Sequence, residues 1–261
     1  MAKKPLILSL ENWQVESFRM TAFVMQGSDF DPQPWWESVA KELAEQQSFS
    51  PRQKVSRYEG RWKKGKLALL SMPSRIDWWY SEIELQDQTQ AVGQEVMLGR
   101  WAEVETLFSE SMRGWLKSSP PLSRLAFGAV LNSPIEDRES GYRRLQSLLP
   151  SVKIDPKGSR DLLYQINRPR KSALGLFPEP LNRLSTWSVL RRSAVALELT
   201  TSDERTSAST NVSTSTELCR LILDMSTPSE HTSAIPKDQL GNVLSELSKM
   251  AAEIATKGDV K

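Results

Sequence analysis

The stretch from Arg52 to Leu85 constrains the fold more than any other part of this sequence. Apolar and polar side chains alternate through three short runs, which are separated by Lys63-Lys64-Gly65-Lys66 and Met72-Pro73-Ser74. Alternation of this kind is typical of strands, and the separating residues are typical of turns. The pattern predicts an antiparallel meander. Because such a meander needs a helix or a second sheet over one face, the rest of the chain must supply that cover.

The chain before Pro121 supplies both further strands and helices. Val15 to Met25 alternates like a strand, and Pro34 to Gln47 spaces its apolar residues in threes and fours, which predicts a helix that starts at a proline. Gln90 to Leu98 is a further strand candidate. A second helix is predicted from Arg100 to Lys117, and the run Ser118 to Pro121 ends it.

The same order of elements starts again after Pro121. The predicted elements are a strand over Leu122–Leu131, a helix over Arg138–Leu149, strands over Arg160–Asn167, Leu184–Thr200 and Asn211–Met225, a short strand near Ala173–Phe177, and a closing helix over Gln239–Thr256. Thr200 to Thr216 holds eleven Ser and Thr in seventeen positions, and we interpret it as part of a long hairpin with a loop from Ser202 to Ser209.

We therefore expect an α+β protein built from two pseudo-repeated β-α-(β)3-4-α units, in which long helices cover antiparallel sheets. The units would be residues 1–119 and 120–261, packed intimately because the Ser118 to Pro121 junction is too short for a free linker. Their sheets would join into one or lie side by side. The order of elements looks like that of a saddle or helix-grip fold, which by itself implies no function.

The residue inventory disfavours several enzyme classes. The chain has one cysteine, Cys219, and one histidine, His231, twelve positions apart, so catalytic pairs and metal sites built from these residues lack members. None of the twelve glycines forms a phosphate-binding motif. Asp77, beside Trp78 and Trp79, is the most suggestive acid, and Asp224 is a candidate for an inward-facing acid, but each also fits a strand face exposed to water. We expect no catalytic residues, no metal and no cofactor.

The sequence also bears on the compartment. A single cysteine fits a reducing environment. The beginning, MAKKPLILSLE, has an apolar run too short for a signal peptide, and no window holds the roughly 18 to 20 apolar residues of a membrane helix. We expect a cytoplasmic protein without a membrane segment.

Charge is concentrated in two windows although the whole chain carries only +2. Residues 52–66 carry a net charge of +6 and residues 160–192 a net charge of +5. If both windows share one sheet face, they would form a nucleic-acid-binding surface, with Tyr58 and Trp62 available to stack on bases. Solvated hairpin tips are the alternative interpretation. The candidate nucleic-acid-binding residues are Arg52, Lys54, Arg57, Arg61, Lys63, Lys64, Lys66, Arg168, Arg170, Lys171, Arg191 and Arg192.

Late segments of the chain resemble a known family. VALELTT (Val195 to Thr201), RLILDMST (Arg220 to Thr227), the closing helix and RLAFGAVL (Arg124 to Leu131) resemble a sporadically distributed bacterial family of uncharacterised proteins over residues 122–255. The resemblance implies no catalytic residues. The scattered occurrence of that family implies a place in antiviral-defence gene neighbourhoods, including those of CRISPR systems.

Our leading hypothesis is a non-enzymatic bacterial accessory protein that binds a protein partner through an aromatic surface. Nine tryptophans are present, and interface energy concentrates in Trp, Tyr and Arg. The candidate anchors are Trp35, Trp36, Trp62, Trp78 and Trp79. Packing at the edge of a core is the alternative for each of them. A nucleic-acid-binding module, a small-molecule or lipid pocket under the long helix, and an unrecognised hydrolase remain as other hypotheses.

Overall fold

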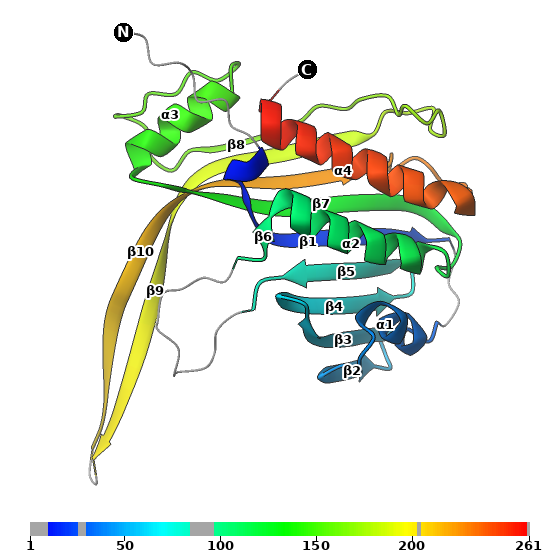
Figure 1. Ribbon diagram of the computed structural model, residues 1–261, viewed down its shortest axis with the longest axis horizontal. Helices are drawn as coiled ribbons and strands as arrows, with labels where there is room; N and C mark the ends of the chain where they lie inside the picture. Colours follow the sequence, from blue (N-terminus) through cyan, green and yellow to red (C-terminus); the bar gives the residue numbers. More distant parts are fainter. Residues whose placement is uncertain (1–9, 26–29, 84–96, 203–204, 260–261) are drawn as a thin grey trace.

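The computed structural model describes residues 10–25, 30–83, 97–202 and 205–259, with side chains throughout these ranges except for residues 193–214. A large antiparallel sheet forms the framework, and four helices lie across one of its faces (Figure 1). In chain order the elements are a short 3-10 turn (Leu10–Asn12), β1 (Gln14–Val24), α1 (Gln33–Ala40), β2 (Gln46–Ser50), β3 (Val55–Trp62), β4 (Gly65–Met72), β5 (Arg75–Ser81), β6 (Gly99–Arg100), α2 (Trp101–Leu116), β7 (Leu122–Ile135), α3 (Arg138–Leu148), β8 (Leu163–Asn167), β9 (Asn182–Ser202), β10 (Arg205–Ser226), a second 3-10 turn (Lys237–Gln239) and α4 (Leu240–Lys257).

The sheet is continuous across the two halves of the chain. Its strand order is β2-β3-β4-β5-β1-β7-β10-β9-β8, and β6 adds a short pairing to β1. The central pair is β1 with β7, which run antiparallel from Gln14 opposite Asn132 to Val24 opposite Leu122. The boundary between the two expected units therefore falls between β1 and β7 inside one sheet, and backbone hydrogen bonds cross it.

Most of the predicted elements are confirmed. The meander consists of β3, β4 and β5, and the turns between its strands fall at Lys63-Lys64 and Pro73-Ser74. The predicted strands and helices after residue 97 are also present, apart from the short strand near Ala173–Phe177, with ends shifted by a few residues. The mixed α+β class with a large antiparallel sheet is thus confirmed.

The helix predicted over Pro34 to Gln47 is wrong in its second half. It ends at Ala40 because Lys41 adopts a left-handed backbone conformation with φ of 63°, and its N–H caps the Glu37 carbonyl. The chain then reverses, and Gln46–Ser50 pairs with β3 as the outermost strand. A backbone reversal at a lysine leaves no sign in the apolar spacing, which explains the error.

Two smaller predictions in the second half also need correction. The stretch Ala173 to Phe177 is a turn, in which Gly175 has φ of +67°. The hairpin loop expected from Ser202 to Ser209 is much shorter, since β9 extends to Ser202 and β10 starts at Arg205, which pairs with it. The strand candidate Gln90 to Leu98 lies mostly outside the described residues.

The apolar core lies between the sheet and the helices. Phe18 of β1 contacts Trp101 and Phe108 of α2 as well as Phe127 of β7, so the first long helix is fixed over the sheet centre. The Trp13 indole N–H donates to the Ala255 carbonyl at 2.8 Å and attaches α4 to the start of β1. The helices cover one face of the sheet, and among the described residues no helix covers the opposite face, which we call the uncovered face (Figure 1).

A long two-stranded arm, formed by β9 and β10, extends from one corner of the sheet (Figure 1). The last pair between β10 and β7 is Glu217 with Ile135, whereas β9 and β10 stay paired from Thr216 and Arg192 to Arg205 and Ser202. At the ordinary rise of a strand, this part of the ladder spans roughly 35 Å. The predicted long hairpin is therefore confirmed as an arm that leaves the body of the sheet.

Candidate functional site

The five predicted tryptophan anchors fall into two environments. Trp36, Trp62 and Trp78 are buried, and Trp36 and Trp78 stack with ring centres 6.4 Å apart beneath α1. Trp35 is half-buried and packs edge-on against Trp115 at 5.8 Å. Trp79 is 48% exposed. Burial removes Trp36, Trp62 and Trp78 from any contact surface, so the expected anchor set reduces to Trp79 and the edge of Trp35.

The contrast between Trp78 and Trp79 follows from strand alternation. Successive side chains of β5 point to opposite faces of the sheet, so Trp78 enters the core and Trp79 lies on the uncovered face. Ile222 of β10, 39% exposed, lies on the same face because its partner in β7 is Val130, next to the buried pair Leu131 and Leu221. Trp79 and Ile222 thus give the uncovered face large apolar side chains on strands from opposite halves of the sheet.

A polar cleft of about 660 Å³ surrounds Trp79 on this face. Arg57, Arg61 and Lys66 from the meander line it together with Arg192 from β9. The structure therefore brings one residue of the second basic window to the first. Arg61 is exposed, while Arg57 and Lys66 both pair with Glu59, an almost buried carboxylate between them.

Two cations share the single Glu59 carboxylate. Burial opposes ionisation of this group, yet hydrogen bonds from Lys66 and Arg57 hold the pKa of Glu59 below its ordinary value. The carboxylate is thus ionised at neutral pH, and the side of the cleft formed by β3 and β4 keeps an excess of positive charge.

A second polar cluster lies at the other end of the cleft, where the arm leaves the sheet. Glu16 receives two hydrogen bonds of 2.7 Å from the Arg220 guanidinium and one of 2.7 Å from the Asn132 amide. Arg192 lies 3.8 Å from the same carboxylate and also pairs with Glu82. These bonds link β1, β7, β9 and β10, so they fix the base of the arm to the sheet.

A third ion pair crosses the centre of the uncovered face. Arg19 of β1 reaches Asp224 of β10 at 3.3 Å, although β7 lies between these two strands. The intervening residue of β7 is Gly128, which pairs with both. Because Gly128 has no side chain, the Arg19 side chain lies directly over it; a Cβ at this position would be 3.6 Å from the Arg19 Nε.

Most of the second basic window lies on the helix-covered side, so the two windows, whose relative placement the sequence left open, do not share one sheet face. Arg168 donates to the Asp259 carboxylate, and Arg170 donates to Glu253 of α4 at 2.6 Å. Arg191 points away from its neighbour Arg192 and pairs with Glu217 at 3.1 Å. Alternation separates Arg191 from Arg192, while Glu253 of α4 and Asp259 just after it neutralise Arg170 and Arg168.

The remaining candidate cations lie at the ends of strands. Arg52 and Lys54 are in the turn between β2 and β3, Lys63 and Lys64 are in the turn between β3 and β4, and Lys171 follows β8. All five are exposed. They extend the charge around the rim of the sheet and do not add to the cleft.

Several residues of the uncovered face had no signal in the sequence. Glu16, Asn132 and Arg220 come from three strands that are far apart along the chain, and only the strand order brings them together. The alternation of β10 could have predicted that Arg220 and Leu221 point to opposite faces of the sheet. It could not have predicted that Arg220 pairs with Glu16.

The groups considered for chemistry occupy structural positions. Asp77 accepts a hydrogen bond from Thr21 at 2.5 Å and pairs with Arg75 at 2.7 Å. Cys219 is buried, and burial raises the pKa of its thiol to about 11. The His231 ring packs edge-on against Phe177 at 5.0 Å. Among the residues that the structure describes, no three acidic, thiol or imidazole side chains converge on a common point.

Comparison with protein-family models finds no match, and a search of curated proteins finds none either. Within the described ranges, none of the helices combines the length and the apolar character needed to cross a lipid bilayer.

Proposed function

We propose that this chain is a non-enzymatic accessory protein whose uncovered sheet face binds a protein partner around Trp79. The observation that carries the proposal is an antiparallel sheet with all four helices on one side and a half-exposed tryptophan, bordered by arginines, on the other. Trp and Arg are the residues that most often dominate the energy of protein interfaces. Ile222 gives the same face a second apolar contact point.

The charge balance of the face favours a protein partner over nucleic acid. The cations Arg19, Arg75, Arg192 and Arg220 are each paired with an acidic side chain of the same face. Nucleic-acid interfaces are much more positively charged than protein interfaces, because they must displace the counterions of phosphates. Paired arginines around a tryptophan fit the polar rim and apolar centre of a protein interface.

The arm supports the same proposal. An isolated two-stranded hairpin is at best marginally stable in water. Beyond the pair Glu217 and Ile135, the described part of the arm contacts no third strand. The Glu16 and Arg192 contacts hold its base beside the Trp79 cleft. We infer that a partner seated on the uncovered face also contacts the arm and stabilises it.

We also propose that the two halves of the chain, residues 1–119 and 120–261, are a tandem pseudo-repeat arranged like a saddle. The strand order supports this proposal, since β5-β4-β3-β2 extend from β1 in the way that β10-β9-β8 extend from β7. Each half also places a helix after its first strand and another after its last strand. The uncovered face would then be one continuous surface to which both halves contribute.

A single strand of nucleic acid is a second candidate partner, which one observation favours. Arg57, Arg61 and Lys66 surround Trp79, and a basic groove with an aromatic platform is the usual way of binding single strands. Salt distinguishes the two candidates, because affinity for a nucleic acid falls steeply with salt concentration. Replacing Arg57, Arg61 and Lys66 by alanine should then abolish binding of a fluorescent oligothymidine at low salt.

The resemblance of residues 122–255 to a scattered bacterial family suggests where to find the partner. Co-expression with the products of neighbouring genes, those of antiviral-defence systems first, should give a complex that stays together during size-exclusion chromatography at micromolar concentration. Trp79→Ala should weaken it by about tenfold or more, the effect of losing an interface hot spot. Leu174→Ala, at an exposed leucine in the turn beside α4 on the helix-covered side, is the control. Elution of the chain alone, or a complex indifferent to Trp79→Ala, would contradict the proposal.

A further inference from the structure

The outer edge of β2 is open on the described part of the chain. This strand, Gln46–Ser50, pairs with β3 on one side and is the last strand of the sheet on the other. Backbone N–H and C=O groups of alternate residues therefore point outward without a strand partner. Edge strands are usually protected by lysine, proline or a bulge, but Gln-Gln-Ser-Phe-Ser contains none of these. The edge is left available for another extended chain.

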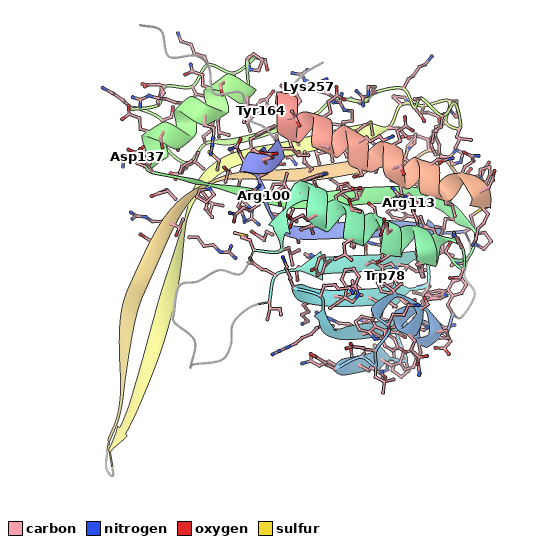
Figure 2. The ribbon with its side chains drawn as sticks, in the orientation of Figure 1. Trp78, Arg100, Arg113, Asp137, Tyr164 and Lys257 are labelled. Carbon is pink, nitrogen blue, oxygen red and sulfur yellow. The ribbon has the colours of Figure 1, made fainter. Side chains whose placement is uncertain are left out.

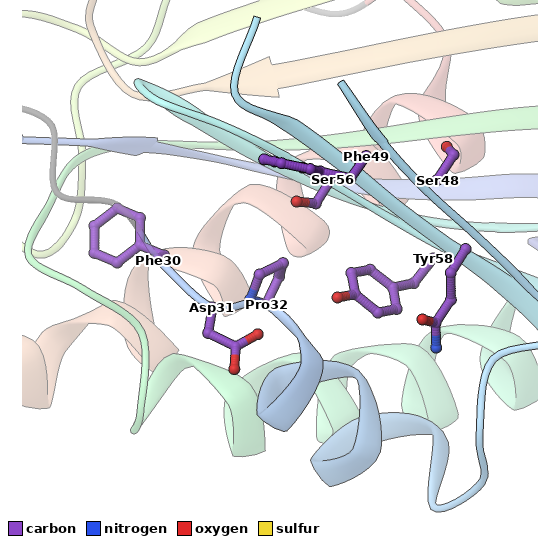
Figure 3. A pocket seen from close by; sticks show the side chains of 8 residues that line it. Phe30, Asp31, Pro32, Ser48, Phe49, Ser56 and Tyr58 are labelled. Atoms are coloured by element: carbon purple, nitrogen blue, oxygen red, sulfur yellow. The ribbon is translucent and has the colours of Figure 1, made fainter. Parts of the chain in front are cut away.

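Phe49 makes this edge unusual, because its ring is 64% exposed. Cavities of about 390 Å³ and about 310 Å³ open on its two sides. Figure 3 shows the first, with Phe30 and Tyr58 at opposite ends, Pro32 and Asp31 on one side, and Ser56 and Phe49 on the other. Met72 and two prolines line the second cavity. Both cavities thus offer aromatic and aliphatic surface to a side chain that enters from the edge.

Opposite charges lie at the two ends of this groove. Asp31 lines the first cavity beside Gln47, and Lys54 lines the second, in the turn that follows β2. Burial, followed by the negative charges of Asp31 and Glu37, raises the pKa of Tyr58, which agrees with a negative potential in the first cavity. A ligand that matches the groove carries a cation at the Asp31 end and an anion at the Lys54 end.

We propose that the edge of β2 binds an extended segment of a partner protein as an added antiparallel strand, with a bulky apolar side chain beside Phe49. An antiparallel strand starts near Lys54 and ends near Asp31, since β2 runs from Gln46 toward the turn. The bound segment therefore has an acidic residue before its apolar centre and a basic residue after it. Main-chain hydrogen bonds supply the affinity, and the cavities supply the specificity.

This site is separate from the Trp79 cleft and does not depend on the proposed function. The cavities lie on the side of the sheet that carries α1, whereas Trp79 lies on the uncovered face. A variant at one site therefore leaves the other intact, and the failure of one proposal is distinguishable from the failure of the other.

The test uses a fluorescent peptide with blocked ends, Thr-Glu-Val-Phe-Val-Lys-Thr, in which the charged side chains and Phe share one face of the strand, and measures its anisotropy with the full chain. We expect saturable binding that Phe49→Ala weakens by about tenfold, as expected for loss of one aromatic anchor. Leu163→Ala on β8, the opposite edge strand, should leave it unchanged, and so should Trp79→Ala. Circular dichroism confirms that each variant is folded.

Two peptide controls test the mode of binding. The charge-reversed order, Thr-Lys-Val-Phe-Val-Glu-Thr, should bind more weakly, because it places like charges at Asp31 and Lys54. N-methylation of alternate residues should abolish binding in one phase and spare it in the other, since only alternate amides face the partner strand.

Four results would overturn the proposal: no saturation of the first peptide, equal or tighter binding of the reversed peptide, equal tolerance of both methylation phases, or an equal loss with Leu163→Ala. A concentration-dependent dimer of the chain that Phe49→Ala dissociates would assign the edge to a second copy and so overturn the partner assignment.

Discussion

Replacing two adjacent tryptophans, Trp78 and Trp79, by alanine should destabilise the protein to very different extents. Trp78 is fully buried, and a buried tryptophan replaced by alanine loses about 3 to 5 kcal/mol. Trp79 is 48% exposed, so about half of its surface is already in water in the folded state. Scaling the same cost by the buried half gives a loss of about 2 kcal/mol for Trp79→Ala.

Equilibrium unfolding in urea, followed by far-ultraviolet circular dichroism, measures both free energies without using tryptophan emission as the signal. Since a domain has about 5 to 15 kcal/mol of total stability, Trp78→Ala should remove a large share of it and Trp79→Ala a smaller one. Trp78→Phe is the control, because it keeps most of the apolar volume and removes an indole N–H that has no hydrogen-bond partner in the described structure. Equal losses for Trp78→Ala and Trp79→Ala would refute the assignment of the two side chains to opposite faces.

Three further predictions concern stability and reactivity. Asp259→Asn should cost about 2 kcal/mol at pH 7, because hydrogen bonds from Arg168 hold the pKa of this carboxyl below its ordinary value. The stabilisation is complete above the pKa of the unfolded state and disappears as the pH falls through the pKa of the folded state. Urea unfolding should therefore show the stabilities of the variant and the wild type converging in acid, and a constant difference would contradict this origin. Gly65→Ala should cost about 2 kcal/mol or more in thermal or urea unfolding, since the added Cβ would overlap the Ser81 carbonyl oxygen. Gly114→Ala, with open space around it in α2, should instead stabilise the protein by about 0.5 to 1 kcal/mol. A neutral Gly65→Ala would show that the strands separate easily at this position. Cys219, buried and with its pKa raised to about 11, should resist iodoacetamide at pH 8 in the native protein and react in urea, and rapid native labelling detected by mass spectrometry would indicate that α3 opens.

The two proposed binding surfaces would hold a partner by different kinds of contact. The partner on the uncovered face would be held by Trp79 and paired arginines, whereas the β2 edge would hold an extended segment through its main chain. Both surfaces are at the meander half of the sheet, and the arm extends from the other half (Figure 2 shows the side chains around the meander and at the base of the arm). A large partner would therefore contact the chain at several separated points, which increases affinity through effective concentration.

The meander, the two long helices and the long hairpin were predictable from the sequence because their signals are local. Turn residues at Lys63-Lys64 and Pro73-Ser74 mark the ends of strands, and an apolar stripe every three or four residues marks α2 and α4. The resemblance of residues 122–255 to a known family stays a prediction. The charge windows were also visible, but their meaning was not, since adjacent residues of a strand point to opposite faces.

The sequence by itself therefore determined the local elements and the alternation of each strand, because backbone propensity and apolar periodicity act over a few residues. Tertiary structure alone decided which face of each strand the helices cover, and so why Trp78 is core and Trp79 is surface. It also decided the strand order that brings Glu16 to Arg220 and Arg19 to Asp224, and it turned the predicted end of a helix into the open edge strand β2. These outcomes depend on contacts between residues as many as 205 positions apart, which no local pattern encodes.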